Sequence, residues 1–201
     1  MLSKKIVDMI SKIIIIEGNV GSGKSVFCSL YATNNPNVIV LEEWVDKKIL
    51  SEYISDMKNK ATDFQFQIQE ETVKRIHKAV DLAKNGKTVL IDRGLIGNRC
   101  FAEIQHEKGY ISEKDIEIYR KKYSYSNIKE SPLGSGIPIE IWYLVCDVEI
   151  CISRIKNRGR SGENLYDFEY LNMLKDKQVE YLNLSLGIDV IRIDSNKNLK
   201  V

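Results

Sequence analysis

The segment Gly18-Asn19-Val20-Gly21-Ser22-Gly23-Lys24-Ser25 fits the pattern GxxxxGK[ST], which is typical of a phosphate-binding loop. It follows the apolar run Ile13–Ile16, which predicts a buried strand, and leads into Lys24–Thr33, which has helical character. The glycines allow backbone N–H groups to point at phosphate oxygens, and the N-terminal end of the helix adds positive charge. We therefore predict that this segment binds ATP, with Lys24 at the β- and γ-phosphates and the Ser25 hydroxyl on Mg²⁺.

Short apolar runs recur after this loop, and longer segments of helical character separate them. The predicted strands are Val38–Leu41, Thr88–Ile91, Ile139–Cys146 and Asp189–Ile193. The predicted helices are Phe64–Lys84, Ser112–Tyr123, Val148–Asn157 and Phe168–Ser185. Continuous apolar runs are typical of strands that are buried on both faces of a parallel sheet. The pattern predicts one α/β domain over residues 1–201, a three-layer fold of the P-loop NTPase type with a five-stranded parallel sheet flanked by helices.

The composition excludes several classes of protein. The 201 residues suit a single domain, and 30 basic against 28 acidic residues leave a formal net charge of only +2. A protein that coats nucleic acid or a membrane would show a strong basic excess, so neither partner is expected. No segment approaches the ~20 apolar residues that cross a bilayer, and none resembles a signal peptide. The four cysteines share no CxxC spacing, which disfavours zinc and favours free thiols in a cytoplasmic protein.

Charged residues follow the second and third predicted strands. Glu42 and Glu43 follow the second strand, and Asp92 and Arg93 follow the third. The carboxyl ends of parallel strands form the ligand-binding edge of an open sheet. Transfer of a phosphoryl group to a hydroxyl needs a carboxylate to accept the proton and cations to hold the moving group. We interpret Glu42 and Arg93 as these groups, and Glu43 as a solvated carboxylate. The chain carries neither a base-reading NKxD element nor the Asp-Glu strand end of motor ATPases, which favours a small kinase.

From about Ile13 to Asn196 the chain resembles the deoxyribonucleoside kinase family, which contains deoxycytidine, deoxyguanosine and mitochondrial-type thymidine kinases. The resemblance rests on the order and spacing of Glu17-Gly18-Asn19, Glu42, Phe66-Gln67, Asp92-Arg93, Arg154…Arg158-Gly159-Arg160…Glu163 and Ile193-Asp194-Ser195-Asn196. It implies ATP-dependent phosphorylation of the 5′-hydroxyl of a deoxynucleoside, a reaction of nucleotide salvage, and a homodimer.

The resemblance also implies a role for each matching residue. Glu42 is expected to be the general base, which Arg93 orients, and Asp92 is expected to hold Mg²⁺ together with Ser25. The nucleoside is expected to contact Gln67 and Asn98 on the side of the base, and Tyr53 and Glu163 at the sugar 3′-hydroxyl. The ATP phosphates are expected to contact a lid at about residues 154–165 that carries Arg154, Arg158 and Arg160. Asp194 and Asn196 match the loop on the adenine side.

Some positions depart from the family pattern. The family usually has Glu-Pro after the second strand, whereas Glu43 and Trp44 follow Glu42 here, which leaves the position of the base open by one residue. Asn98 stands where purine- and cytosine-preferring members carry Asp, and Lys74 lies near the position of their Arg. The preferred nucleobase therefore stays open.

Two other functions share part of this pattern. A thymidylate-type nucleoside monophosphate kinase has the same fold and phosphate loop, but its acceptor is a phosphate, which a nearby carboxylate would repel unless extra arginines offset it. A nucleotide-binding module without turnover would have no need of the residues that act on the phosphates. The apolar residues of Phe64–Lys84 and Phe101–Tyr123 suit either a dimer face or the core of one chain.

Overall fold

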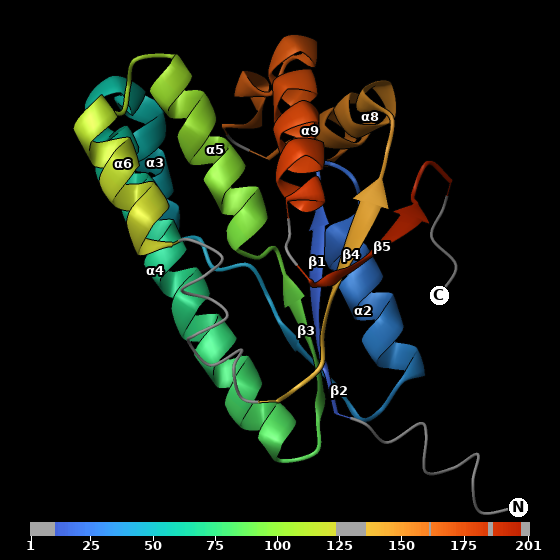
Figure 1. Ribbon diagram of the computed structural model, residues 1–201. Helices are drawn as coiled ribbons and strands as arrows, with labels where there is room; N and C mark the ends of the chain where they lie inside the picture. The colour runs from blue at the N-terminus through green and yellow to red at the C-terminus, as the bar shows by residue number, and fades with distance from the viewer. Residues whose placement is uncertain (1–10, 124–135, 161, 185–186, 198–201) are drawn as a thin grey trace, which may run out of the picture.

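The computed structural model describes residues 11–123, 136–160, 162–184 and 187–197. Its centre is a sheet of five parallel strands in the spatial order β2-β3-β1-β4-β5 (Figure 1). The strands are β1 (Ile13–Gly18), β2 (Val38–Leu41), β3 (Thr88–Asp92), β4 (Ile139–Val145) and β5 (Asp189–Asp194). This all-parallel sheet confirms the predicted fold class, and each predicted strand ends within two residues of an observed one.

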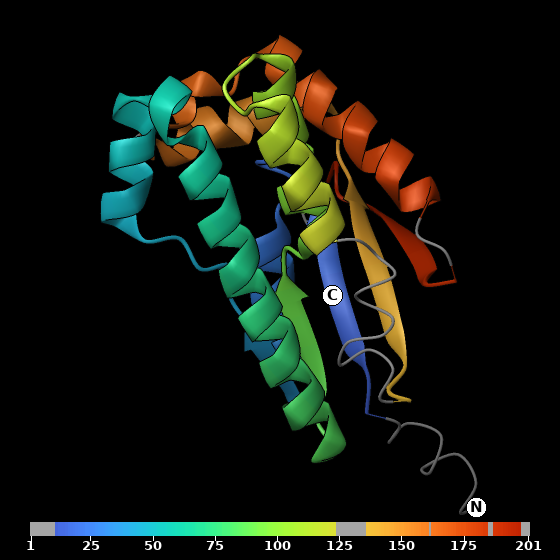
Figure 2. The ribbon, with the colours of Figure 1, turned by 60° about the vertical axis from the view of Figure 1, so that its left-hand side comes forward.

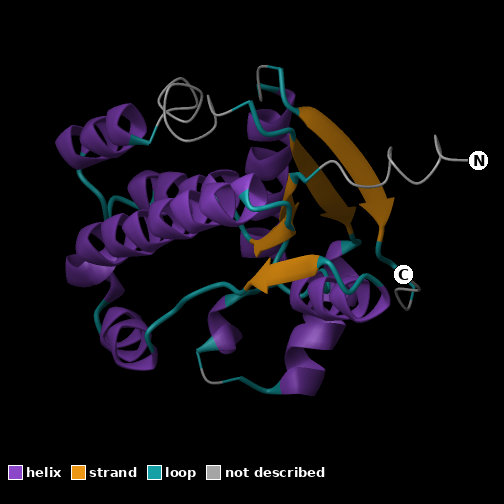
Figure 3. Ribbon diagram, turned by 90° about the horizontal axis from the view of Figure 1, so that it is seen from below, coloured by secondary structure: helices purple, strands orange, loops and turns teal. Residues whose placement is uncertain are grey.

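Helices cover both faces of the sheet (Figure 3). They are α2 (Lys24–Asn34), α3 (Lys47–Ser55), α4 (Met57–Lys84), α5 (Leu95–Glu107), α6 (Glu113–Lys122), α8 (Val148–Arg158) and α9 (Phe168–Asn183), with a short 3₁₀ turn, η2 (Glu163–Leu165). Along β1, Ile14 and Ile16 pack with Phe27 of α2, whereas Ile13 and Ile15 belong to the cluster under α4, α5 and α9. Because side chains alternate along a strand, a continuous run of isoleucines fills both cores.

A third apolar cluster lies away from the sheet, where α3, α4 and α6 meet (Figure 2). Ile116 and Tyr119 of α6 are fully buried there, and Phe66 of α4 packs edge-on against the Tyr119 ring at 5.3 Å. Core packing within one chain therefore accounts for many of the apolar residues of Phe64–Lys84 and Phe101–Tyr123, which would also suit a dimer face.

Two helices of the site were not predicted as helices, and a third begins earlier than predicted. The side chain of Asp46 accepts hydrogen bonds from the backbone N–H groups of Lys48 and Ile49 at 2.8 and 3.0 Å, which starts α3. The next helix, α4, begins at Met57 instead of Phe64. α5 holds Gly97 and Asn98 in its first turns, residues of low helix propensity, and tertiary contacts described below stabilise this end.

Among the described residues, no helix is long and apolar enough to span a membrane. All four cysteines are buried free thiols, as the sequence predicts.

Candidate active site

The phosphate-binding loop joins β1 to α2, as its motif predicts. Lys24 lies at the first position of α2, and its Nζ donates to the carbonyl oxygens of Gly18 and Asn19 at 3.0 and 2.8 Å. At Gly18, where φ is 150°, a Cβ would lie 2.7 Å from the Ser22 Oγ. The loop residues that line the cavity described below are Val20, Gly21, Gly23, Lys24 and Ser25.

Lys24 is only 6% exposed, and this burial lowers its pKa from 10.5 to about 8. Phosphate anions favour the charged form of the lysine, so binding of ATP should raise the pKa of Lys24, and the protein should take up a proton on binding.

We therefore expect the affinity for Mg-ATP to be full below pH 8 and to fall as the pH rises through about 8 to 9.5. Isothermal titration calorimetry between about pH 7.5 and 9.5 measures this, because the phosphates themselves are fully ionised there. The matched control is Lys24→Arg, whose guanidinium stays charged in this range and should give a flat profile. Equal pH dependence in both proteins would contradict the prediction.

Ser25 and Asp92 meet where α2 faces the end of β3. The Ser25 Oγ donates to the Asp92 Oδ2 at 2.6 Å, and the buried Asp92 Oδ1 has no hydrogen-bond partner among the described residues. A hydroxyl and one carboxylate suit Mg²⁺, which is commonly held by one or two protein oxygens together with phosphate oxygens and water. The described part of the chain holds no cluster of three or more His, Cys, Asp or Glu side chains, so the pair fits a cation carried by the nucleotide.

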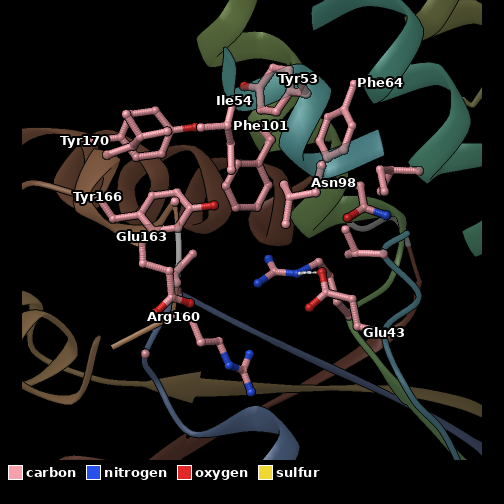
Figure 4. Close-up of a pocket in the computed structure, with 18 of the residues that line it drawn as sticks. Glu43, Tyr53, Ile54, Phe64, Asn98, Phe101, Arg160, Glu163, Tyr166 and Tyr170 are labelled. Carbon is pink, nitrogen blue, oxygen red and sulfur yellow. Dashed lines mark ion pairs between the residues drawn. The ribbon is translucent and has the colours of Figure 1, made fainter. Parts of the chain in front are cut away.

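The carboxylate beside Arg93 is Glu43, one residue later than expected. The Arg93 Nε and the Glu43 Oε1 form an ion pair at 2.6 Å, and both residues line the cavity (Figure 4). Both glutamates are partly exposed, but Glu42 does not line the cavity. Beyond Leu41 the strand has ended, so the alternation of inward and outward side chains no longer determines which of two consecutive glutamates turns inward.

Arg93 is almost completely buried, at 4% exposure. Burial by itself would raise the pKa of Glu43, but attraction to Arg93 and then to Lys24 and Arg75 outweighs it and lowers that pKa. Glu43 is therefore ionised at neutral pH. Arg93 has a φ of 64°, and no other non-glycine residue in the described ranges has a positive φ. Such a conformation is strained, and strained residues cluster at functional sites.

A cavity of about 560 Å³ extends from the phosphate loop and the Glu43–Arg93 pair to α3, α4 and α5 (Figure 4). This volume falls in the usual range for small-molecule sites. The rings of Tyr53 and Phe64 stack at 4.2 Å with only 3° between their planes, and Phe101 lies 5.1 Å from the Arg93 guanidinium. The other aromatic residues of the lining are Tyr110, Tyr166 and Tyr170. Flat apolar walls of this kind suit a planar ring.

Of the two neighbouring glutamines of α4, Gln65 lines this cavity and Gln67 does not. α4 buries Gln65, Ile68 and Thr72 on one face, a spacing of three and four residues that follows the helical repeat. Gln67 lies two residues, or about 200° of rotation, away from Gln65 and therefore belongs to a different face. The expected alignment on Phe66-Gln67 was wrong because Phe64-Gln65 repeats the same pair of residues.

Asn98 lines the cavity from α5, as expected, and its Nδ2 donates to the Thr72 Oγ1 at 2.7 Å. Lys74, which the sequence places near a family arginine, is exposed and pairs with Glu71 at 2.5 Å. The residue of α4 that accepts from Asn98 is therefore Thr72.

The segment after α8 lies against the opposite wall. Arg158, Arg160 and Glu163 line the cavity, and the Arg158 Nε donates to the Glu163 Oε2 at 2.8 Å. Between them Gly162, with φ at 84°, lies so close to α3 that a Cβ would be 2.2 Å from the Ile54 Cδ1. Glu163 and Tyr53 are thus placed in the cavity as expected.

The structure does not bring Arg154, Asp194 or Asn196 into the cavity. The Arg154 guanidinium donates to backbone carbonyls on two sides, to Ser22 of the phosphate loop at 3.3 Å and to Ser195 at 2.8 Å. The expected phosphate contact of Arg154 is therefore replaced by a link between the phosphate loop and the loop after β5. Asn196 accepts from the backbone N–H of Asp147 at 2.7 Å, and its own N–H donates to Asp194 at 2.9 Å, so these two residues tie that loop to the start of α8.

The model of the deoxynucleoside kinase family matches residues 14–201. The chain belongs to the deoxynucleoside kinase family. It is 31% identical over 175 residues to the "Probable deoxycytidine kinase" of Fowlpox virus, covering 86% of this chain and 72% of that protein. It is 29% identical over 195 residues to the deoxyguanosine kinase of Dictyostelium discoideum, covering 94% of this chain and 66% of that protein. The solved structure of a deoxyadenosine kinase from M. mycoides with bound dATP shares the fold, with a TM-score of 0.73 and 24% identity over 94% of this chain and 92% of that chain.

Glu17 lies beside this deoxynucleoside kinase site, and the sequence pattern assigns it no role. Glu17 is fully buried at the end of β1, and its Oε1 accepts from the N–H groups of Gly94 and Gly97 at 3.0 and 3.1 Å. These N–H groups belong to the N-terminal end of α5, where a carboxylate is favourable. A Cβ at Gly97 would lie 2.5 Å from the Glu17 Oε2 and 3.0 Å from the Arg93 Nη1. The signal in the sequence is a carboxylate directly after four buried isoleucines.

Proposed function

We propose that this protein transfers the γ-phosphoryl group of ATP to the 5′-hydroxyl of a deoxynucleoside, with Mg²⁺ bound to the nucleotide. The observation that supports this most is the Glu43–Arg93 ion pair, which lies in one aromatic-lined cavity together with Lys24 and Ser25 of the phosphate loop. A neutral hydroxyl can approach an ionised Glu43, and Arg93 can balance the charge that develops on the phosphoryl group.

In the proposed reaction, Glu43 takes the proton of the 5′-hydroxyl as the 5′-oxygen forms a bond to the γ-phosphorus. The bond from that phosphorus to the bridging oxygen breaks in line, and ADP leaves with the electron pair. Lys24 and Arg93 hold the moving group. When bound between Ser25 and Asp92, Mg²⁺ would neutralise charge on the phosphates. We propose that Tyr53 and Glu163 bind the sugar, and that residues 154–165 form a lid of which Arg158 and Arg160 face the phosphates.

The base side of the cavity favours a nucleobase that carries its amino group at C4 of a pyrimidine or at C6 of a purine. The Thr72 hydroxyl donates its one hydrogen to the Ile68 carbonyl at 3.0 Å, and it accepts from Arg75 at 2.8 Å and from the Asn98 Nδ2 at 2.7 Å. Since no hydrogen is left for an oxygen of Asn98, that residue must present its nitrogen to Thr72 and its oxygen to the cavity (Figure 4). Cytosine and adenine can donate to this oxygen through their amino group, whereas the O4 of thymine and the O6 of guanine would face it as a second acceptor. Gln65 can both donate to and accept from the base edge.

The experiment is a transfer assay with ATP labelled at the γ-phosphate and, as acceptors, the four deoxynucleosides and dTMP. We expect labelled 5′-monophosphates, with kcat/KM for deoxycytidine and deoxyadenosine about 10- to 100-fold above that for thymidine and deoxyguanosine. Faster transfer to thymidine would contradict the assignment of Asn98.

The same assay tests the alternatives. Product from dTMP alone would support the monophosphate kinase, and ATP binding without transfer to any acceptor would support the non-catalytic module. Family membership favours the nucleoside kinase over both. We also propose a homodimer, which sedimentation at micromolar protein concentration tests, because Ile118 of α6 is 47% exposed beside the buried cluster.

A further inference from the structure

Arg75 of α4 is a largely buried arginine whose hydrogen bonds all go to neutral acceptors. Its Nη1 donates to the carbonyl oxygens of Glu42 at 3.2 Å and Asp92 at 2.8 Å. Its Nη2 donates to the carbonyl oxygen of Arg93 at 3.1 Å and to the Thr72 Oγ1 at 2.8 Å. Arg75 does not line the cavity. A buried arginine usually pairs with a carboxylate, so four neutral acceptors indicate that its planar, fixed donors serve geometry.

Three of these acceptors, the carbonyls of Glu42, Asp92 and Arg93, lie just beyond the ladder between β2 and β3, although Asp92 still pairs with Ile16 of β1. The ladder between β2 and β3 ends at Leu41 and Ile91, so the carbonyls that follow it need other partners. The Arg75 guanidinium binds the backbone carbonyl of Glu42, which precedes Glu43, and the backbone carbonyls of Asp92 and Arg93. This joins the ends of β2 and β3, which carry the two members of the ion pair, to a single residue of α4.

The left-handed backbone of Arg93 is held from both sides. Its N–H donates to the Ile16 carbonyl of β1 at 3.0 Å, and its carbonyl accepts from Arg75. A non-glycine residue with φ at 64° persists only where its surroundings fix it. Arg75 supplies the contact on the carboxyl side.

The fourth bond reaches the base side of the cavity. Arg75 occupies one lone pair of the Thr72 hydroxyl, so a single lone pair remains to accept the Asn98 Nδ2. Arg75 thereby helps to fix the orientation of the Asn98 amide. The same guanidinium therefore contacts the backbone of the catalytic pair and the residue that holds Asn98.

We propose that Arg75 is a positioning residue that sets the Glu43–Arg93 pair and, through Thr72, the orientation of Asn98. This rests on the proposed function, since it presumes that the pair acts in phosphoryl transfer and that Asn98 reads the base. Arg75 thereby couples turnover and base selectivity without touching the substrate.

The test replaces Arg75 by Met and its neighbour Lys74 by Met as the matched control, because Lys74 is exposed and pairs only with Glu71. We expect Arg75→Met to lower kcat for deoxycytidine about 10- to 100-fold and to reduce the preference for deoxycytidine over thymidine about 10-fold. The Kd for Mg-ATP should change less than about twofold, since the bonds of Arg75 described above reach the backbone carbonyl of Asp92 but neither its carboxylate nor the phosphate loop. Lys74→Met should match the wild type.

A second variant separates the bonds of Arg75 to the strand ends from its bond to Thr72. Thr72→Val keeps the bonds of Arg75 to the strand ends and removes the acceptor of Asn98, so selectivity should fall about as far as in Arg75→Met while kcat falls less. If Arg75→Met does not fold, Arg75→Lys replaces it, because a single ammonium cannot span acceptors on two strands and a helix. Added methylguanidinium should restore part of the kcat of Arg75→Ala, which a general loss of stability would not allow.

A crystal structure of Arg75→Met keeps this test independent of the proposed function. We expect residue 93 to leave the left-handed region. If φ stays near +60° and both kcat and selectivity remain within about twofold of the wild type, the positioning role is wrong. If the wild type shows no transfer to any deoxynucleoside, the proposed function fails, while the conformation of residue 93 still decides the role of Arg75.

Discussion

Replacing Glu43 by Gln is expected to lower kcat for deoxynucleoside phosphorylation by about 10²- to 10⁴-fold, the usual contribution of a general base. Gln keeps the shape of the side chain and an oxygen that can accept a hydrogen bond from Arg93, but it cannot take the proton of the hydroxyl. The KM for the nucleoside should therefore change by less than about threefold. Steady-state kinetics with deoxycytidine at saturating Mg-ATP measures both values.

Glu42→Gln is the matched control, since it makes the same change one residue away on an exposed side chain. We expect its kcat to stay within about twofold of the wild type. A large loss in Glu42→Gln together with an active Glu43→Gln would show that the loop after β2 turns the other glutamate inward when substrate binds.

Arg93→Lys is expected to lower kcat by about 10²- to 10³-fold although it keeps the charge. The ion pair with Glu43 uses the Arg93 Nε, whereas the Arg93 Nη1 is buried without a hydrogen-bond partner in the described part of the chain. The Nη1 donors are therefore available to the phosphoryl group. A lysine ammonium is smaller, not planar and more strongly hydrated, so it cannot bind Glu43 and a phosphoryl oxygen in the same geometry.

Arg99→Lys, on the helix α5 that follows Arg93, provides the comparison. Arg99 pairs with Glu103 at 3.3 Å and lies over the Tyr181 ring, away from the cavity. Its replacement should leave kcat within about twofold and lower the melting temperature by a few degrees at most. If Arg93→Lys keeps more than about a third of the wild-type kcat, charge alone accounts for the role of Arg93.

The sequence predicts those parts of the site that lie next to regular structure. The phosphate loop is anchored between four isoleucines and a helix start, so Lys24 and Ser25 could be placed from their spacing. Asp92 and Arg93 directly follow the buried run of β3, where an open parallel sheet binds its ligands. The fold follows from the same runs, since continuous apolar strands require cover on both faces.

Positions inside irregular or repeated segments could not be predicted. Glu42 and Glu43 are chemically identical neighbours beyond the end of β2, and only the contact with Arg93 distinguishes them. Gln65 and Gln67 occur in two copies of Phe-Gln, and the rotation of α4 that decides between them comes from packing against α5. The bonds of Arg75 to the ends of β2 and β3 are tertiary contacts over 17 to 33 residues, which no local pattern reveals.

The most direct test of the central claim is a crystal structure of the protein with deoxycytidine and a non-hydrolysable ATP analogue. We expect the 5′-oxygen to lie about 3 Å from the Glu43 carboxylate and the cytosine amino group to lie within hydrogen-bond distance of the Asn98 oxygen. A nucleoside whose 5′-oxygen faces Glu42, or whose ring lies outside the cavity between Phe64 and Phe101, would contradict the account.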